Sequence, residues 1–113
     1  MDKSKIIEIA QKRKRLWDET QDEYDYGIQQ VCDELTNLIV SDLPGAIKFM
    51  CEDPDCDDEI FADWSEVFDD VVRKTQSKEF LEALKVAAKR FPEACAKYSI
   101  AYSIECAEDE LLD

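Results

Sequence analysis

The scarcity of turn-forming residues is the strongest constraint on the fold of this chain. Its 113 residues include only two glycines and three prolines. A β-sheet protein of this length needs Gly, Pro and similar turn residues at each hairpin, so an all-β fold is disfavoured. Residues with high helix propensity, such as Ala, Leu, Glu and Lys, are abundant. The composition therefore predicts an all-α protein.

Apolar residues recur at helical spacing along most of the chain, and this periodicity predicts five to six helices. The clearest pattern runs over 60–72, where apolar residues fall at i, i+1, i+4, i+7, i+8, i+11 and i+12. Residues 1–113 are expected to form one domain, either an irregular bundle or a stack of helical hairpins, with 109–113 as a frayed tail. The predicted helices cover about 2–17, 20–39, 44–51, 60–72, 78–91 and 92–108, the last carrying Tyr98, Ala101 and Tyr102.

Local signals mark several helix boundaries. Thr20 and Glu23 have the spacing of a capping box, in which each side chain bonds the other's backbone amide. Pro44 and Pro92 are suited to the first turn of a helix, where the missing amide proton is not needed. Ser77 is a favourable N-cap for the helix that follows it.

Acidic residues are concentrated in the middle of the chain. Between Leu16 and Val72 there are eighteen Asp and Glu residues and one cation, Lys48, so this stretch carries a formal charge of −17. Residues 1–15 carry +4 and residues 73–113 carry −1, and the chain as a whole carries −14. Like charges at short range destabilise a compact state. We therefore interpret the concentration as serving a positively charged partner.

Catalysis and cofactor binding are not predicted. The absence of histidine excludes Ser-His-Asp and Cys-His arrangements and removes the commonest general base. Two glycines are too few for a phosphate-binding loop or a dinucleotide fingerprint. We expect a binding protein without a cofactor.

A metal site is also not predicted, although one segment partly matches a calcium loop. Asp53, Asp55 and Asp57 fall at the first, third and fifth positions of an EF-hand, but Asp58 replaces the required Gly and Trp64 the required Glu. The five cysteines are expected to be reduced thiols, mostly small buried residues. Cys56, in the acidic loop, is expected to be exposed.

Two acidic groups are the candidate partner-binding surface. Within 59–70, four acids at i, i+4, i+7 and i+11 are predicted to form one stripe opposite the apolar face, where like charges destabilise a helix. A structural helix would alternate Lys or Arg with these acids. The second group surrounds two tyrosines, whose apolar rings and polar tips suit an interface. The predicted partner-binding residues are Asp22, Glu23, Tyr24, Asp25, Tyr26, Asp53, Asp55, Glu59, Asp63, Glu66, Asp69 and Asp70.

The location of the protein is predicted from its N-terminus and its hydropathy. Glu8 and the polar residues 11–15 interrupt the apolar start, so no signal peptide is expected. No apolar run approaches the ~20 residues that a membrane span needs. We expect a soluble cytoplasmic protein, monomeric before it forms a complex. Its acidic charge argues against direct binding of nucleic acid or anionic membranes.

These features together resemble the immunity proteins of bacterial polymorphic-toxin and contact-dependent inhibition systems. The resemblance lies in the short chain, the isoelectric point near 4.3 and the acidic groups at 18–25 and 53–70 on a helical scaffold. It implies an inhibitor that occludes a basic toxin domain, in many cases a nuclease, with one inhibitor per toxin.

Two other functions fit the same features. One is a nucleic-acid mimic that inhibits a DNA- or RNA-binding protein, which shares the electrostatics and differs in its partner. The other is an acidic adaptor or secretion chaperone, which would more often be dimeric and expose an apolar groove.

Overall fold

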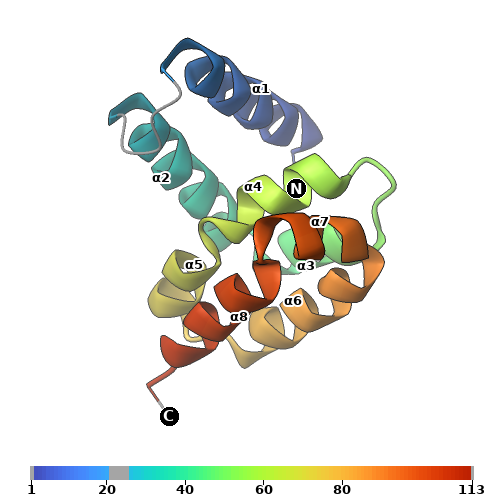
Figure 1. Ribbon diagram of the computed structural model, residues 1–113. Helices are drawn as coiled ribbons and strands as arrows, with labels where there is room; N and C mark the ends of the chain where they lie inside the picture. Colours follow the sequence, from blue (N-terminus) through green and yellow to red (C-terminus); the bar gives the residue numbers. More distant parts are fainter. Residues whose placement is uncertain (1, 21–25, 113) are drawn as a thin grey trace.

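The protein is entirely helical in the part of the chain that the structure describes, residues 2–20 and 26–112 of a computed structural model (Figure 1). The predicted all-α class is confirmed. The described residues form eight helices instead of five to six: α1 (Lys3–Thr20), α2 (Tyr26–Ser41), α3 (Leu43–Glu52), α4 (Asp58–Ser65), α5 (Phe68–Thr75), α6 (Lys78–Arg90), α7 (Pro92–Tyr98) and α8 (Ile100–Asp109). The predicted capping box of Thr20 and Glu23 lies outside the described side chains.

The predicted helix over 60–72 is wrong as a single element, because the chain leaves helical geometry after α4. Val67, with φ −115° and ψ 6°, precedes α5 and is fully buried. The apolar periodicity is continuous across this break, since Phe61 and Trp64 before it and Phe68 after it are all buried. The two halves pack mainly on different neighbours, α4 on α7 and α5 on α8 and α2, although α4 also contacts α8. The break lets one continuous apolar run contact α7 with its first half and α8 and α2 with its second half.

A second break, at Ser99, separates α7 from α8. Ser99 has φ 53°, the left-handed region that a non-glycine residue seldom adopts. The change of direction buries Ile100 and Ile104. Tyr98 and Tyr102 are left 48% and 67% exposed. This break accounts for the second additional helix.

Aromatic side chains form the centre of the core. Phe61 stacks on Phe91 at 5.1 Å between ring centroids and contacts Phe68 at 5.6 Å. Such pairs contribute about 0.5–1.5 kcal/mol each beyond their buried area. Helices α3 to α8 supply most of this core, whereas α1 packs mainly on α2 to form a hairpin at one end of the molecule (Figure 1).

Side-chain caps begin α3, α4 and α6. The Ser77 hydroxyl accepts from the Phe80 amide at 3.0 Å, which confirms the predicted N-cap of α6. Asp57 accepts from the Ile60 amide at 2.9 Å at the start of α4. Asp42 accepts from the Gly45 amide at 3.1 Å, with a proline in the first turn of α3 as predicted.

The C-terminal residues contact the end of α5 through Gln76. Its side-chain amide donates to the Glu110 carbonyl at 2.9 Å and accepts from the Leu112 amide at 2.9 Å. Fraying, which we predict for 109–113, would have to break both hydrogen bonds.

Candidate functional site: an acidic groove between α1 and α4

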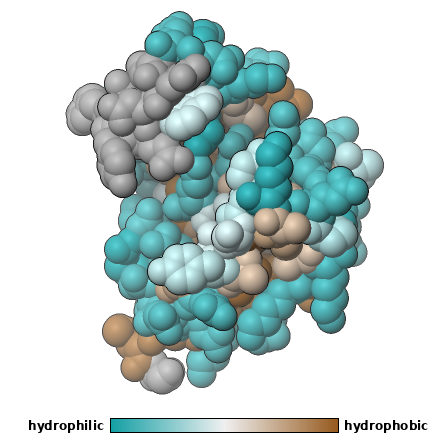
Figure 2. All heavy atoms as spheres, in the orientation of Figure 1, coloured by the Kyte–Doolittle hydropathy of each residue, from teal (hydrophilic) through white to brown (hydrophobic). Residues whose placement is uncertain are grey.

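A groove of about 520 Å³ lies between α1, α4 and the end of α7. The N-terminal hairpin stands beside α4 (Figure 1). Residues of α1 line one side of this groove. Hydrophilic residues cover most of the same face, with less hydrophilic ones over α7 and α8 (Figure 2). The lining residues are Ile7, Ala10, Gln11, Arg13, Lys14, Trp17, Asp18, Asp57, Glu59, Ile60, Ala62, Asp63, Glu66 and Tyr98.

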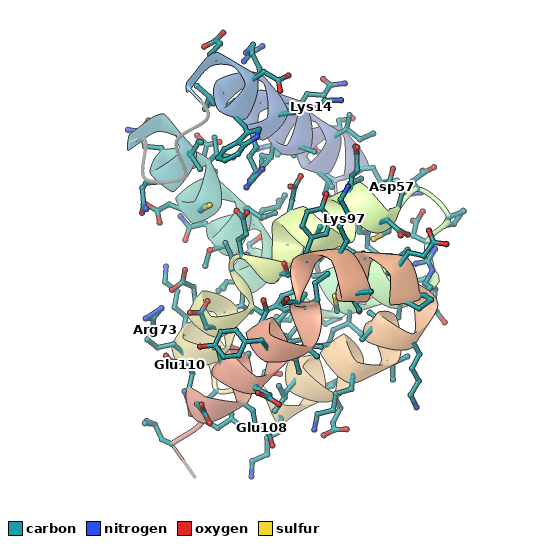
Figure 3. The ribbon with its side chains drawn as sticks, viewed as in Figure 1. Lys14, Asp57, Arg73, Lys97, Glu108 and Glu110 are labelled. Atoms are coloured by element: carbon teal, nitrogen blue, oxygen red, sulfur yellow. The ribbon has the colours of Figure 1, made fainter. Side chains whose placement is uncertain are left out.

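Five carboxylates and two cations line the groove. Asp57, Glu59, Asp63 and Glu66 come from α4 and its two ends, and Asp18 comes from the last turn of α1. We call the first four the α4 wall. Lys14 and Arg13 belong to α1. Figure 3 shows Lys14 on α1 and Asp57 near the start of α4. The groove therefore has a net negative charge and an apolar part supplied by Trp17, Tyr98 and smaller side chains.

Arg13 connects α1 to the α4 wall. Its Nε donates to Glu66 Oε2 at 3.1 Å, a second nitrogen bonds the other oxygen of Glu66, and Nη1 lies 3.4 Å from Asp63 Oδ1. The Arg13 side chain is 16% exposed. Burial acts to lower the pKa of Arg13, but Glu66 and Asp63 outweigh it and hold that pKa above its usual value. This bidentate pair is the favoured geometry between a guanidinium and a carboxylate.

The surroundings of Asp63 in the α4 wall change its protonation. Burial raises its pKa to about 6, and the negative charges of Glu66 and Glu59 act in the same direction. Arg13 opposes the shift without cancelling it. Asp63 therefore changes charge just below neutral pH.

The predicted stripe of four acids is not one surface. Glu59 and Asp63 lie on α4, Glu66 follows its end, and Asp70 lies on α5. Asp63 and Glu66 bind Arg13, and Asp70 pairs with Arg73 on the same helix. Arg73 also lies 4.0 Å from Glu110 (Figure 3). The prediction missed these partners because two of the three pairs are distant in sequence.

The other predicted partner-binding residues have different positions. Lys3 lies 2.8 Å from Asp53 and 3.2 Å from Asp55, and this contact lowers the pKa of Asp53. Asp69 accepts from the next backbone amide at the start of α5. Glu59 is exposed in the groove. The described residues do not include four predicted ones, Asp22, Glu23, Tyr24 and Asp25. The predicted Tyr26 begins α2, but its side chain is not among those described.

Several groove residues were not predicted to bind a partner. Among them are Asp57, which caps α4, and Trp17, which lies in the last turn of α1. The adjacent pair of Trp17 and Asp18 is an aromatic beside an acid, the same signal that singled out the two tyrosines. Tyr98 lies far from the other groove residues in sequence, so no local pattern could have placed it there.

Metal-binding geometry is not found in the described part of the chain, where no three His, Cys, Asp or Glu residues are grouped to hold an ion. The expected exposure of Cys56 is wrong, since its side chain is buried at 2% exposure. Burial raises the pKa of Cys56 to about 12 and that of Cys32 to about 11. Both thiols are therefore protonated at neutral pH.

Comparison with protein-family models, with curated proteins and with solved structures finds no match for this chain. Among the helices described, none has the length and apolar character needed to cross a membrane.

Proposed function

We propose that this protein binds a basic toxin domain, such as a nuclease, and neutralises it by occluding its active or substrate-binding site with one inhibitor per toxin. The observation that carries the proposal is the acidic groove, in which carboxylates outnumber cations and lie beside two aromatic rings. Interfaces between proteins are enriched in aromatic residues, and charge complementarity selects the partner.

At least three of the six cations of the N-terminal helix are paired within the molecule. Lys3 is held by Asp53 and Asp55, Lys12 lies 3.2 Å from Glu34, and Arg13 is held by the α4 wall. These intramolecular pairs take up much of the positive charge of α1. The excess of acids therefore remains to interact with a partner.

Long-range attraction would give this binding its speed. A protein of charge −14 accelerates encounter with a basic domain, and the association rate falls as salt screens both charges. The site of a nuclease binds phosphates through cations. Carboxylates held on a helix can occupy such a site in place of the phosphates.

The variant that tests the surface reverses Asp18 and Glu59 to lysine. Both side chains are exposed in the groove, and neither belongs to the Arg13 cluster. Glu79→Lys with Glu108→Lys is the matched control, because each pair has one acid in a first helical turn and one in a last turn. Glu108 lies at the far end of the molecule from Lys14 (Figure 3).

The experiment captures the partner from the native organism with tagged protein, identifies it by mass spectrometry and measures its activity against added inhibitor. We expect one basic toxin domain, full inhibition at equal stoichiometry and an association rate that falls with salt. The groove variant should lose inhibition, and the control variant should keep it. A captured protein whose activity is unchanged by stoichiometric binding would refute the proposal, and a captured host DNA-binding protein would favour the nucleic-acid mimic.

A further inference from the structure

We infer that the Arg13 cluster is a pH-sensitive contact, which holds α1 tightly against α4 while Asp63 is protonated and lets α1 separate locally more often once Asp63 is ionised. The cluster consists of Arg13 on α1 with Asp63 and Glu66 of the α4 wall. The inference goes beyond the proposed function, because it concerns how this side of the groove opens and not what binds there.

The cluster contains one carboxylate more than its guanidinium can neutralise. Arg13 directs Nε and a second nitrogen at the two oxygens of Glu66, so its paired donors are committed to that residue. Asp63 is approached by Nη1 at the longer distance of 3.4 Å. The side chains of Arg13 and Asp63 are only 16% and 24% exposed. The surplus negative charge therefore lies partly out of water, and a proton on Asp63 removes it.

Asp63 also borders an apolar cavity on its inner side. This cavity of about 10 Å³ lies between α1, α2 and α4, and Asp63 lines both the cavity and the groove. The cavity walls are mainly apolar and include Ile6, Ile9 and Trp64. Such a volume holds at most about one water molecule. An ionised Asp63 is therefore hydrated mainly from the groove side, and burial of this kind favours the neutral acid.

The charged and titratable groups that surround Asp63 come from α1, α2, α4 and α7. They are Arg13 and Lys14 on α1, Cys32 on α2, Asp57, Glu59 and Glu66 along α4, and Tyr98 with the adjacent Lys97 on α7. Helix α8 also contacts α4, but none of its described charged residues lines the cavity or the groove. Burial raises the pKa of Asp63 to about 6, and Arg13 opposes this shift less strongly than burial and the neighbouring acids promote it.

Helix α1 is attached to the rest of the molecule lightly enough to separate by itself. It packs mainly on α2, and its polar links beyond that helix include the Arg13 cluster and the half-exposed Lys3 with Asp53. Ile6, at 1% exposure, is the apolar side chain that separation would uncover. An open form would hydrate Asp63 and restore its ordinary pKa of 3.8. The closed form is therefore favoured at low pH and loses that advantage as the pH rises through about 6.

Amide hydrogen exchange of the whole protein, followed by NMR and corrected for intrinsic exchange rates, tests this contact. We expect amides 7–17 in α1 to be less protected than amides 81–89 in α6, because local opening needs less free energy than global unfolding. Their protection should fall about tenfold between pH 5 and 7, as follows from a pKa of 3.8 in the open form and about 6 in the closed form. The carboxyl carbon signal of Asp63 should titrate with a midpoint near 6.

Asp63→Asn is the deciding variant, because asparagine has nearly the same shape and cannot ionise. The protection of α1 should then change by less than about twofold over the same pH range. Asp70→Asn is the matched control and should keep the wild-type response, since it also removes a carboxylate paired with an arginine, but within α5. Equal protection of α1 and α6, or the same pH response in wild type and Asp63→Asn, would overturn the inference. An Asp63 midpoint near its ordinary 3.8 would do so without any variant.

Discussion

Arg13 and Glu66 join the first helix to the end of α4, with Nε of the arginine 3.1 Å from Oε2 of the glutamate. They are 53 positions apart in the sequence. Because α1 otherwise packs mainly on α2, this pair is a main polar connection between the N-terminal hairpin and the rest of the molecule. It also determines which acids of the groove remain open to a partner.

Replacing Arg13 should destabilise the protein. Arg13→Met keeps most of the aliphatic length but leaves Asp63 and Glu66 without their cation, and we expect a loss of about 1–3 kcal/mol in the free energy of unfolding. Urea denaturation measures the loss. Lys12→Met removes a more exposed pair with Glu34 and should cost at most about 1 kcal/mol. Equal losses in the two variants would show that the Arg13 cluster has no special structural role.

The stability of the protein should depend on the protonation of Asp63. Its pKa is about 6 in the folded state against an ordinary 3.8, so the folded state binds a proton that the unfolded state releases between these values. The stability that protonated Asp63 contributes is therefore fully present below its ordinary pKa of 3.8. It is lost as the pH rises through the folded-state pKa of about 6. The free energy of unfolding of the wild type minus that of Asp63→Asn should fall between pH 4 and 7. Parallel pH profiles would contradict this assignment.

The cysteines should differ in their reactivity. The pKa of Cys56 is about 12 and that of Cys32 about 11, both raised mainly by burial, so very little thiolate is present at neutral pH. We expect these two to react last when the folded protein is treated with iodoacetamide and analysed by mass spectrometry over time. In denaturant all five should react at similar rates. Early alkylation of Cys56 would show that it is accessible in the native state.

Ser99 and Gln76, the two described non-glycine residues with a positive φ, should differ in how replacement by glycine changes the stability of the protein. Ser99→Gly relieves a positive φ at a position where no side-chain cap is formed, and should change stability between zero and a gain of about 1 kcal/mol. Gln76→Gly relieves the same strain but removes both hydrogen bonds to residues 110–112, so it should be less stable than Ser99→Gly. Thermal unfolding compares them. A larger gain from Gln76→Gly would mean that these hydrogen bonds contribute little.

Helix boundaries were predictable from the sequence where the signal is local. Ser77 and Pro44 act on backbone groups within three or four residues, so their effect does not depend on the rest of the fold. The breaks at Val67 and Ser99 have no such signal. Apolar spacing continues through Val67, and only packing against different helices selects the interruption there.

The acidic site was predictable only in part. The excess of acids between Leu16 and Val72 and the exposure of Glu59 on a helix follow from composition and spacing. The role of Asp63 does not, because its neighbour Arg13 is brought there by tertiary packing. The approach of Trp17 and Tyr98 to the same groove depends equally on how α1 and α7 meet α4.

The sequence by itself determined that this protein is helical, that it carries a charge of −14 and that eighteen of its 28 acidic residues lie in one stretch. Tertiary structure alone decided which acids are neutralised within the molecule and which line an open groove. The physical reason is range. Helix propensity and capping act over one or two turns, whereas an ion pair such as Arg13 with Glu66 requires the fold to bring distant residues together.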